Sequence, residues 1–310
     1  MTLDVLYERE RTPAEPGPGH LSEGLLRALE VSLARRVEGL LAGDYRSRLL
    51  GRGTELAQIR PYVPGADDVR QIDWNVTART GLAHVRSQLA ERTLVTWVVL
   101  DASSSMEFGT TLRRKADVAE GVALALGYAA SRSGNRLGVV TFGAEGTRTC
   151  PPRAGHDGML GLILGLRRQG APTAGAGTLA AALHCTVRLA RQSSLVVVAS
   201  DFRGPADWRQ PLLELAGRHE VIGAEIRDPR EQELPDIGIV RLVDPETNRQ
   251  VRVNTSSAAL RTHFAAVAAA ERRDVAKLLA AAGVRHVVLD TEADWLHKLT
   301  TFLRLRPVGR

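Results

Sequence analysis

The feature that most constrains the fold is an alternation of short apolar runs with helical patterns, which begins near residue 93. The runs TLVTWVVL at 93–100, RLGVVTF at 136–142 and LVVVAS at 195–200 are rich in β-branched residues and short enough for strands. Strands that alternate with helices form a mostly parallel sheet covered on both faces. We therefore predict an α/β fold with a doubly wound, mostly parallel sheet.

The alternation stops near residue 236 and resumes at 284. Two β-like pieces flank PETN and predict a hairpin over 237–243 and 249–254, and an Ala- and Leu-rich stretch predicts a helix over 256–282. We expect these elements to form an insertion at about 236–283, before the last strand. The α/β domain would then span residues 92–310.

The first ninety residues have a different character. The Pro- and Gly-rich segment TPAEPGPG at 12–19 predicts a flexible stretch, so we expect residues 1–19 to be a flexible N-terminus. Leucines and valines at spacings of three and four predict an amphipathic helix over 20–42. The turn-rich segment PGADDVRQIDW lies between two β-like pieces, so residues 20–91 should form a helix and a small β-rich subdomain.

Charge and composition narrow the function classes. The formal net charge of +6 is spread thinly, and 38 of the 41 basic residues are arginines, which indicates a compositional bias more than a phosphate-binding surface. With Cys150 and Cys185 alone, thiol-based zinc sites are not expected. The first ten residues carry four charges, and the apolar runs are far shorter than a membrane span. We expect a cytoplasmic protein without membrane insertion or a nucleic-acid partner.

Polar side chains gather where the predicted strands end. Asp101, Ser103 and Ser105 follow the first strand, Asp201 follows the strand at 195–200, and Thr178 opens the helix before that strand. Ligand sites of open parallel sheets lie outside the carboxyl ends of the strands. Hard oxygen donors without sulfur or imidazole suit Mg²⁺, with Mn²⁺ or Ca²⁺ as alternatives. Each of the three hydroxyl side chains alone could belong to a helix cap or turn residue. The three hydroxyls and the two carboxylates together favour a metal site.

The pattern Asp101-x-Ser103-x-Ser105, Thr178, Asp201 resembles the metal-ion-dependent adhesion site (MIDAS) of the von Willebrand factor A domain. The segments RPYVPGADDVRQIDWNVTART, LDASSSMEFG and LVDPETNRQVRVNTS further resemble the bacterial domain-of-unknown-function 58 family. The resemblance implies that Ser103 and Ser105 bind the ion directly and Thr178 directly or through water. It implies that Asp101 and Asp201 act mostly through water or hydrogen bonds, and that an acidic residue of a partner completes the site.

The same resemblance implies a function. Members of this family are commonly associated with MoxR-type AAA+ ATPases, which implies a non-enzymatic, Mg²⁺-dependent protein-binding module. We therefore expect a chaperone-like adaptor of such an ATPase in protein maturation or remodelling. Many relatives carry two amino-terminal membrane helices. This sequence shows none, so a membrane role is not expected to carry over.

Two further groups of residues are candidates for partner binding. Asp67, Asp68, Arg70 and Asp73 belong to a charged segment that is either a docking surface or, as the density of Pro and Trp favours, an ion-pair and turn network with Trp74 packed. Met106 and Phe108 are either exposed partner contacts or loop packing. The run Arg113-Arg114-Lys115 is expected on a solvated helix face.

Two functions from other classes stay open. An Asp after the first strand of a doubly wound sheet is the nucleophile of aspartate-based phosphoryl-transfer hydrolases, although Ser103 stands where those enzymes carry a general acid. The Arg-rich composition also leaves a nucleic-acid-binding protein as an alternative. Affinity for nucleic acid would then fall steeply with salt.

Overall fold

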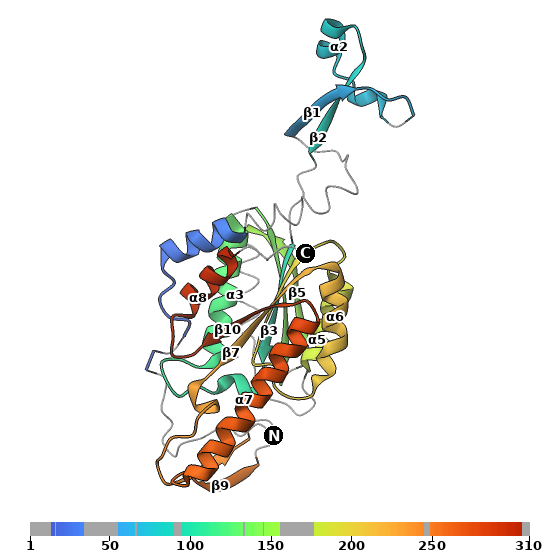
Figure 1. Cartoon of the computed structure of the whole chain (residues 1–310). Helices are drawn as coiled ribbons and strands as arrows, with labels where there is room; N and C mark the ends of the chain where they lie inside the picture. Colours follow the sequence, from blue (N-terminus) through green and yellow to red (C-terminus); the bar gives the residue numbers. More distant parts are fainter. Residues whose placement is uncertain are drawn as a thin grey trace. The chain divides into compact units, whose positions relative to one another are not determined.

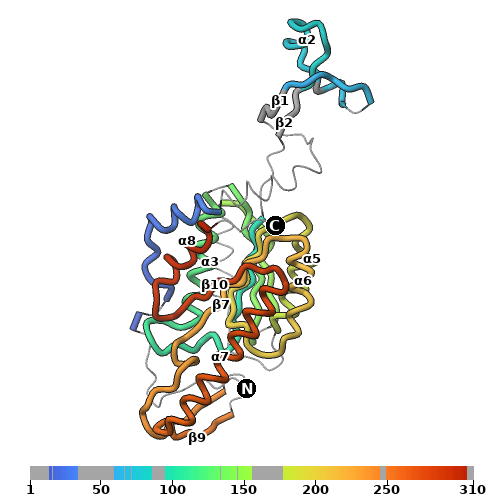
Figure 2. Tube along the Cα trace, in the orientation of Figure 1, coloured from blue at the N-terminus to red at the C-terminus, as the bar shows by residue number. Residues whose placement is uncertain are grey.

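The computed structural model describes residues 14–15, 17–33, 55–65, 67–89, 95–132, 134–144, 146–155, 177–244 and 249–305. The chain divides into two compact units (Figures 1 and 2). The larger unit comprises residues 1–36 and 94–310, and the smaller comprises residues 37–93.

The described part of the larger unit is built on a six-stranded sheet of order β10-β7-β6-β3-β4-β5. All neighbouring strands are parallel except β5, which runs antiparallel to β4 at the edge. The strands are β3 (Val95–Ala102), β4 (Arg136–Gly143), β5 (Arg148–Ala154), β6 (Leu195–Ser200), β7 (Glu220–Arg227) and β10 (Arg285–Asp290). The predicted α/β class with a mostly parallel sheet is confirmed.

Helices cover both faces of this sheet (Figure 1). On one face lie α3 (Lys115–Arg132) and α8 (Trp295–Arg304), and on the other lie α5 (Leu179–Leu189) and α6 (Arg209–Arg218). The second face buries a large apolar cluster that includes Trp97 on β3 and Trp208. Short 3-10 helices join the strands and helices; they are η2 (Ser104–Glu107), η3 (Ala206–Trp208) and η4 (Pro229–Glu231).

The strand order fixes where a ligand site should lie. From the central strand β3 the chain runs outward through β4 to β5, and then returns to the other side of β3 through β6, β7 and β10. The order therefore reverses between β3 and β6. Crevices outside the carboxyl ends of strands at such a reversal are the usual ligand sites of open α/β sheets.

Between β7 and β10 the chain forms a hairpin and a long helix. Strands β8 (Ile239–Val243) and β9 (Gln250–Asn254) pair antiparallel, and α7 (Ala258–Ala281) follows them. A second apolar cluster joins the hairpin to the N-terminal half of α7; its members are Phe108, Leu234, Val240, Leu242, Val253, Leu260 and Phe264. None of the helices within the described ranges has the length and hydropathy that a bilayer span requires.

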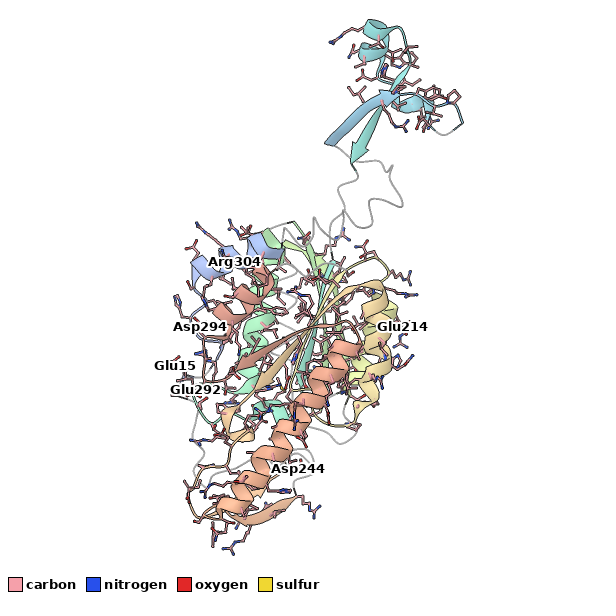
Figure 3. All side chains as sticks on the ribbon, in the orientation of Figure 1. Glu15, Glu214, Asp244, Glu292, Asp294 and Arg304 are labelled. Carbon is pink, nitrogen blue, oxygen red and sulfur yellow. The ribbon has the colours of Figure 1, made fainter. Side chains whose placement is uncertain are left out.

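Of the N-terminus predicted to be flexible over 1–19, residues 1–13 and 16 lie outside the described residues, whereas residues 14–15 and 17–19 include ones that make hydrogen bonds within the larger unit (Glu15 is labelled in Figure 3). Glu15 N donates to Leu112 O at 2.8 Å, and Trp295 Nε1 donates to Pro18 O at 3.0 Å. The helix predicted over 20–42 is described over residues 23–33, where it buries leucines 26, 29 and 33 in the larger unit; residues 34–42 lie outside the described residues. We expected this helix to belong to the β-rich subdomain. In the structure it belongs to the larger unit instead, because the apolar face of the helix packs with the α/β unit.

The smaller unit contains a two-stranded antiparallel sheet. Its described elements are β1 (Glu55–Pro61), η1 (Val69–Gln71), α2 (Trp74–Thr80) and β2 (His84–Leu89). Asp73 caps the first turn of α2, and the αL residue Gly81 ends that helix. Val85 is buried, whereas no side chain of α2 is.

Candidate functional site

The candidate site lies at the carboxyl ends of β3 and β6, where the strand order reverses. Asp101 is near the end of β3, and Ser200 ends β6. Ser200 Oγ donates to Asp101 Oδ2 at 2.5 Å, and Ser103 N donates to Asp101 Oδ1 at 2.9 Å. Asp101 is buried, so the carboxylate holds the two strand ends together from inside the protein.

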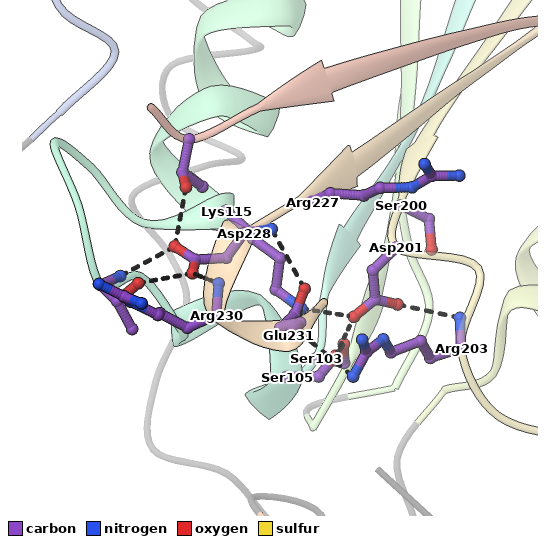
Figure 4. A network of polar contacts seen from close by, with 12 residues as sticks. Ser103, Ser105, Lys115, Ser200, Asp201, Arg203, Arg227, Asp228, Arg230 and Glu231 are labelled. Atoms are coloured by element: carbon purple, nitrogen blue, oxygen red, sulfur yellow. Dashed lines mark hydrogen bonds and ion pairs between the residues drawn. The ribbon is translucent and has the colours of Figure 1, made fainter. Parts of the chain in front are cut away.

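Two predicted ligand hydroxyls lie next to the second carboxylate (Figure 4). Ser103 Oγ is 3.0 Å from Ser105 Oγ, and Ser105 Oγ donates to Asp201 Oδ2 at 2.9 Å. Asp201 is oriented by a tight turn in which Arg203 N donates to its Oδ1 at 3.0 Å. The turn places Phe202 at a φ of 54°, an unusual backbone conformation for a residue with a side chain.

Thr178 reaches the same edge of the sheet through a neighbouring loop. Its Oγ1 accepts from Ala181 N at 3.2 Å and so caps α5. The preceding Gly177 N donates to Gly143 O at 2.7 Å. Gly143 packs so closely on the end of β3 that a Cβ there would lie 2.3 Å from Ala102 O. The structure thus brings Asp101, Ser103, Ser105 and Asp201 into contact and places Thr178 at their edge.

Lys115 belongs to the same cluster of side chains, which the sequence pattern did not predict. Its Nζ lies 2.8 Å from Asp201 Oδ2 and 2.6 Å from Glu231 Oε1, and its side chain is completely buried. The expectation of a solvated face is wrong for Lys115, whose side chain points into the cluster of carboxylates (Figure 4), and for Arg113, which is buried and paired with Glu15. One signal was present, since this arginine-rich chain has only three lysines, at positions 115, 277 and 298.

The two aspartates have opposite electrostatic environments. Burial and the nearby charge of Asp201 raise the pKa of Asp101 to about 7. Burial also acts to raise the pKa of Asp201, but the positive charges and hydrogen bonds of Lys115 and Arg203 outweigh it and hold that pKa below its usual value. Asp201 therefore carries the permanent negative charge of the pair.

A third carboxylate fixes the loop that leads from the site into α3. Asp228 is fully buried and accepts hydrogen bonds from Thr110 N at 2.9 Å, Thr110 Oγ1 at 2.6 Å and Thr291 Oγ1 at 2.8 Å. Its own backbone N donates to Glu231 Oε2 at 3.2 Å. Glu231, the second partner of Lys115, is thereby held in place. The sequence does carry a local signal for this pair, because Asp228-Pro229-Arg230-Glu231 has the Asp-x-x-Glu spacing of a capping box with Pro at its first helical position.

The donor set fits a hard divalent cation. The separation of 3.0 Å between Ser103 Oγ and Ser105 Oγ is that of two adjacent ligands in an octahedron with metal–oxygen distances of about 2.1 Å. Ser103, Ser105 and Thr178 supply neutral oxygens, with the two aspartates behind them. Among the residues that the structure describes, no group of three or more His, Cys, Asp or Glu side chains is placed to hold a metal.

Met106 and Phe108 are not surface contacts. The loop after Ser103 winds into η2, which turns both side chains inward, and Met106 is fully buried. Phe108 packs with Leu234, Val240 and Leu242 beneath the hairpin. The partner-binding interpretation of these two residues is wrong, and loop packing is the role that the structure assigns to them.

The charged segment of the smaller unit forms turns and caps. Asp67 pairs with Arg60 and accepts from Val63 N at 2.9 Å, while Asp68 accepts from Arg70 N at 3.0 Å to cap η1. Asp73 caps α2 by accepting from Asn75 N at 3.0 Å. These contacts are those of a turn network. The expected packing of Trp74 is wrong, because its side chain projects from the first turn of α2 and is 68% exposed.

One family model and several curated relatives match this chain over much of its length. The family model described as "Protein of unknown function DUF58" matches residues 58–274. The uncharacterized protein Rv1480 of Mycobacterium tuberculosis is 42% identical over 288 residues, which cover 92% of this chain and 89% of that protein. The uncharacterized protein MAV169 of Mycobacterium avium is 41% identical over 160 residues, which cover 51% of this chain and 94% of that protein.

Solved structures show lower similarity. The conserved hypothetical protein BatB from Bacteroides thetaiotaomicron has 12% identity and a TM-score of 0.41, over 68% of this chain and 97% of that chain. A von Willebrand factor type A protein from Catenulispora acidiphila has 16% identity and a TM-score of 0.30, over 47% of this chain and 35% of that chain. The match to the family model and the relative at 42% identity show that the chain belongs to the DUF58 family of proteins of unknown function.

Proposed function

We propose that this protein is a non-enzymatic binding module that captures a protein partner through a divalent cation, Mg²⁺ in the first place. The observation that carries the proposal is the contact of Ser103, Ser105 and Asp201 at the reversal of strand order. Ser103 and Ser105 would hold the ion directly, with Thr178 as a third ligand and Asp101 and Asp201 behind them. Because the ligand hydroxyls are neutral, the ion keeps affinity for a carboxylate of the partner.

The position of Asp101 supports binding over catalysis. Both of its carboxylate oxygens accept hydrogen bonds from the protein, and the side chain is buried. A nucleophilic aspartate must present an oxygen to the substrate, whereas the side chain of Asp101 is buried among its hydrogen-bond donors. The phosphoryl-transfer alternative therefore gains no support from the geometry.

The finer description of the fold belongs to the same proposal. The larger unit would be a von Willebrand factor A-like domain, with the β8–β9 hairpin and α7 inserted before its last strand. The supporting features are the Asp-x-Ser-x-Ser pattern at the reversal of strand order and the sequence position of the hairpin and α7, between β7 and β10.

The proposed partner is a MoxR-type AAA+ ATPase, or a client protein that presents an acidic residue, in the cytoplasm. Its support is the sequence resemblance described above. The chain would then act as an adaptor in protein maturation or remodelling.

Capture of a purified MoxR-type ATPase from the same organism tests the proposal. Binding is measured by biolayer interferometry with Mg²⁺, with EDTA, and for the double variant Ser103→Ala/Ser105→Ala. Ser131→Ala, which removes a hydroxyl bonded to Tyr128 O on α3, is the matched control. We expect capture with Mg²⁺ by the wild type and by S131A, and loss of capture in the other two cases. Equal capture in all four cases would overturn the proposal.

A further inference from the structure

Lys115 places a fixed positive charge beside the proposed ion site. The same oxygen of Asp201 receives hydrogen bonds from Lys115 Nζ at 2.8 Å and from Ser105 Oγ at 2.9 Å. The ammonium group and the ligand hydroxyl therefore lie within ~6 Å of each other, a range over which buried charges interact strongly. A divalent ion on Ser105 would experience this charge directly.

The surrounding charges are already partly balanced without an ion. Lys115 bridges Asp201 and Glu231, and Arg203 Nη1 lies 3.4 Å from Glu231 Oε1. Together with Asp101, the cluster holds three carboxyl groups and two cationic groups. A buried lysine is stable only when it is paired in this way. The same pairing lowers the electrostatic attraction that Asp201 offers to an incoming metal.

We infer that Lys115 is an internal cation that competes with the divalent ion for Asp201 and so sets the metal affinity of the site. This inference rests on the proposed function, because it concerns the same site. A weakened site binds its ion firmly only when a partner carboxylate completes the ligand shell. By thermodynamic linkage, the factor by which the partner raises the affinity for the ion equals the factor by which the ion raises the affinity for the partner.

Glu231 keeps the ammonium group of Lys115 paired while a metal ion competes for Asp201. Lys115 Nζ is closer to Glu231, at 2.6 Å, than to Asp201, at 2.8 Å. When a metal draws on Asp201, the ammonium group keeps its salt bridge to Glu231. Lysine suits this role because its charge is compact and its stem is flexible, whereas the guanidinium of arginine is a rigid fork.

Direct measurement of metal affinity tests the inference. Mn²⁺ binding is followed by electron paramagnetic resonance, and Mg²⁺ binding by competition with Mn²⁺. The variants are Lys115→Met and the control Lys298→Met, which loses the same charge from a surface ion pair with Asp290. We expect K115M to bind Mn²⁺ at least roughly tenfold more tightly than the wild type. K298M should stay within about twofold of the wild type, because surface charges are screened.

A second variant keeps the test decisive if K115M folds poorly. Lys115→Met/Glu231→Gln removes the cation together with its second partner, so no buried charge is added to the cluster. Because Asp201 also loses its competitor here, we expect this variant too to bind Mn²⁺ more tightly than the wild type. If the wild type binds Mn²⁺ measurably and the folded variants bind Mn²⁺ no more tightly than the wild type, the inference fails. The proposed function is not affected by that result.

The other outcomes separate the inference from the proposed function. If neither the wild type nor either variant binds Mn²⁺, both ideas fail. If the variants bind Mn²⁺ more tightly but capture of the ATPase ignores the metal, the proposed function fails and the inference stands. Tighter Mn²⁺ binding together with metal-dependent capture supports both.

Discussion

Ser200 Oγ donates a hydrogen bond to Asp101 Oδ2 across the point where the strand order of the sheet reverses. The bond ties the end of β6 to the end of β3. Asp101 also accepts from Ser103 N, so its carboxylate orients the first residue of the loop that carries both proposed ligand serines. The strand ends and the loop form one polar unit, in which Asp101 acts as an internal anchor.

Asp101 should make the protein less stable as the pH rises toward neutrality. Its pKa is about 7 in the folded protein, against about 3.9 for an unperturbed aspartate. Between these values the folded state holds a proton that the unfolded state has lost. The stabilising effect is complete below about pH 4 and disappears as the pH rises through about 7, with a slope of up to roughly 1.4 kcal/mol per pH unit.

Asp101→Asn removes the titrating group and should flatten this dependence. The measurement is urea unfolding in EDTA from pH 5 to pH 8. The control is Asp290→Asn, which alters a partly exposed ion pair with Lys298 and should keep the wild-type slope. An unchanged slope in D101N would show that Asp101 is not the titrating group.

Lys115 should contribute strongly to stability through its two partners. Lys115→Met leaves Asp201 and Glu231 buried without their shared cation, and we expect a loss of about 3–5 kcal/mol in the free energy of unfolding. The double variant Lys115→Met/Glu231→Gln should recover part of this loss, because one buried charge leaves with the other.

Chemical unfolding at pH 7.5 in EDTA measures these differences. Lys298→Met, on the surface, should change stability by less than about 1 kcal/mol. A loss in K115M no larger than that in K298M would contradict the assignment of Lys115 as the central cation of the cluster.

Local patterns predicted much of this fold. The run at 195–200 coincides with β6. The hairpin strands expected over 237–243 and 249–254 begin two residues before β8 and one residue before β9, respectively, and end where those strands end. Strands and hairpins of this kind can be predicted, because they depend on neighbouring residues in the sequence and on the periodicity of burial. The proximity of the aspartates and serines was also predictable, because strand ends of a parallel sheet meet at one edge.

What the sequence did not predict depends on contacts between distant segments. Lys115 lies 86 positions from Asp201 and 116 from Glu231, and only the folded sheet brings the three together. Burial of single side chains was equally hidden. Met106 follows three serines and Trp74 follows an aspartate, yet Met106 is buried and Trp74 is largely exposed.

Gly143 should be essential for the geometry of the site. Its φ of 152° disfavours any side chain, and a Cβ would lie 2.3 Å from Ala102 O and 2.8 Å from Ser103 N. Gly143→Ala should therefore push the serine loop away, with a loss of more than roughly 1 kcal/mol in stability and weaker Mn²⁺ binding.

The matched control for this change is Gly217→Ala in α6. A Cβ at Gly217 meets nothing within 4 Å, and alanine favours a helix, so this variant should gain up to about 1 kcal/mol. Thermal unfolding compares the two variants, and Mn²⁺ titration follows the site. Similar effects of both substitutions would show that the contact with β3 does not restrict position 143.

Trp74 should behave as the solvent-exposed tryptophan of this chain. Its side chain is 68% exposed, whereas Trp97, Trp208 and Trp295 are each 2% exposed. Trp74→Phe should remove the fluorescence component that acrylamide quenches most readily. The same substitution should remove the most red-shifted part of the emission. Because Trp74 stands outside the packed interior of its unit, stability should change by no more than about 0.5 kcal/mol.

The contrasting variant is Trp208→Phe, at a residue whose ring packs edge-to-face on Phe202 at a centroid distance of 5.6 Å. This variant should leave the acrylamide-sensitive component in place and lower stability, since a buried aromatic contact is lost. If W74F instead unfolds more readily and quenching persists, Trp74 is packed in solution. The charged segment around Asp73 would then be a packing element, as its density of Pro and Trp first suggested.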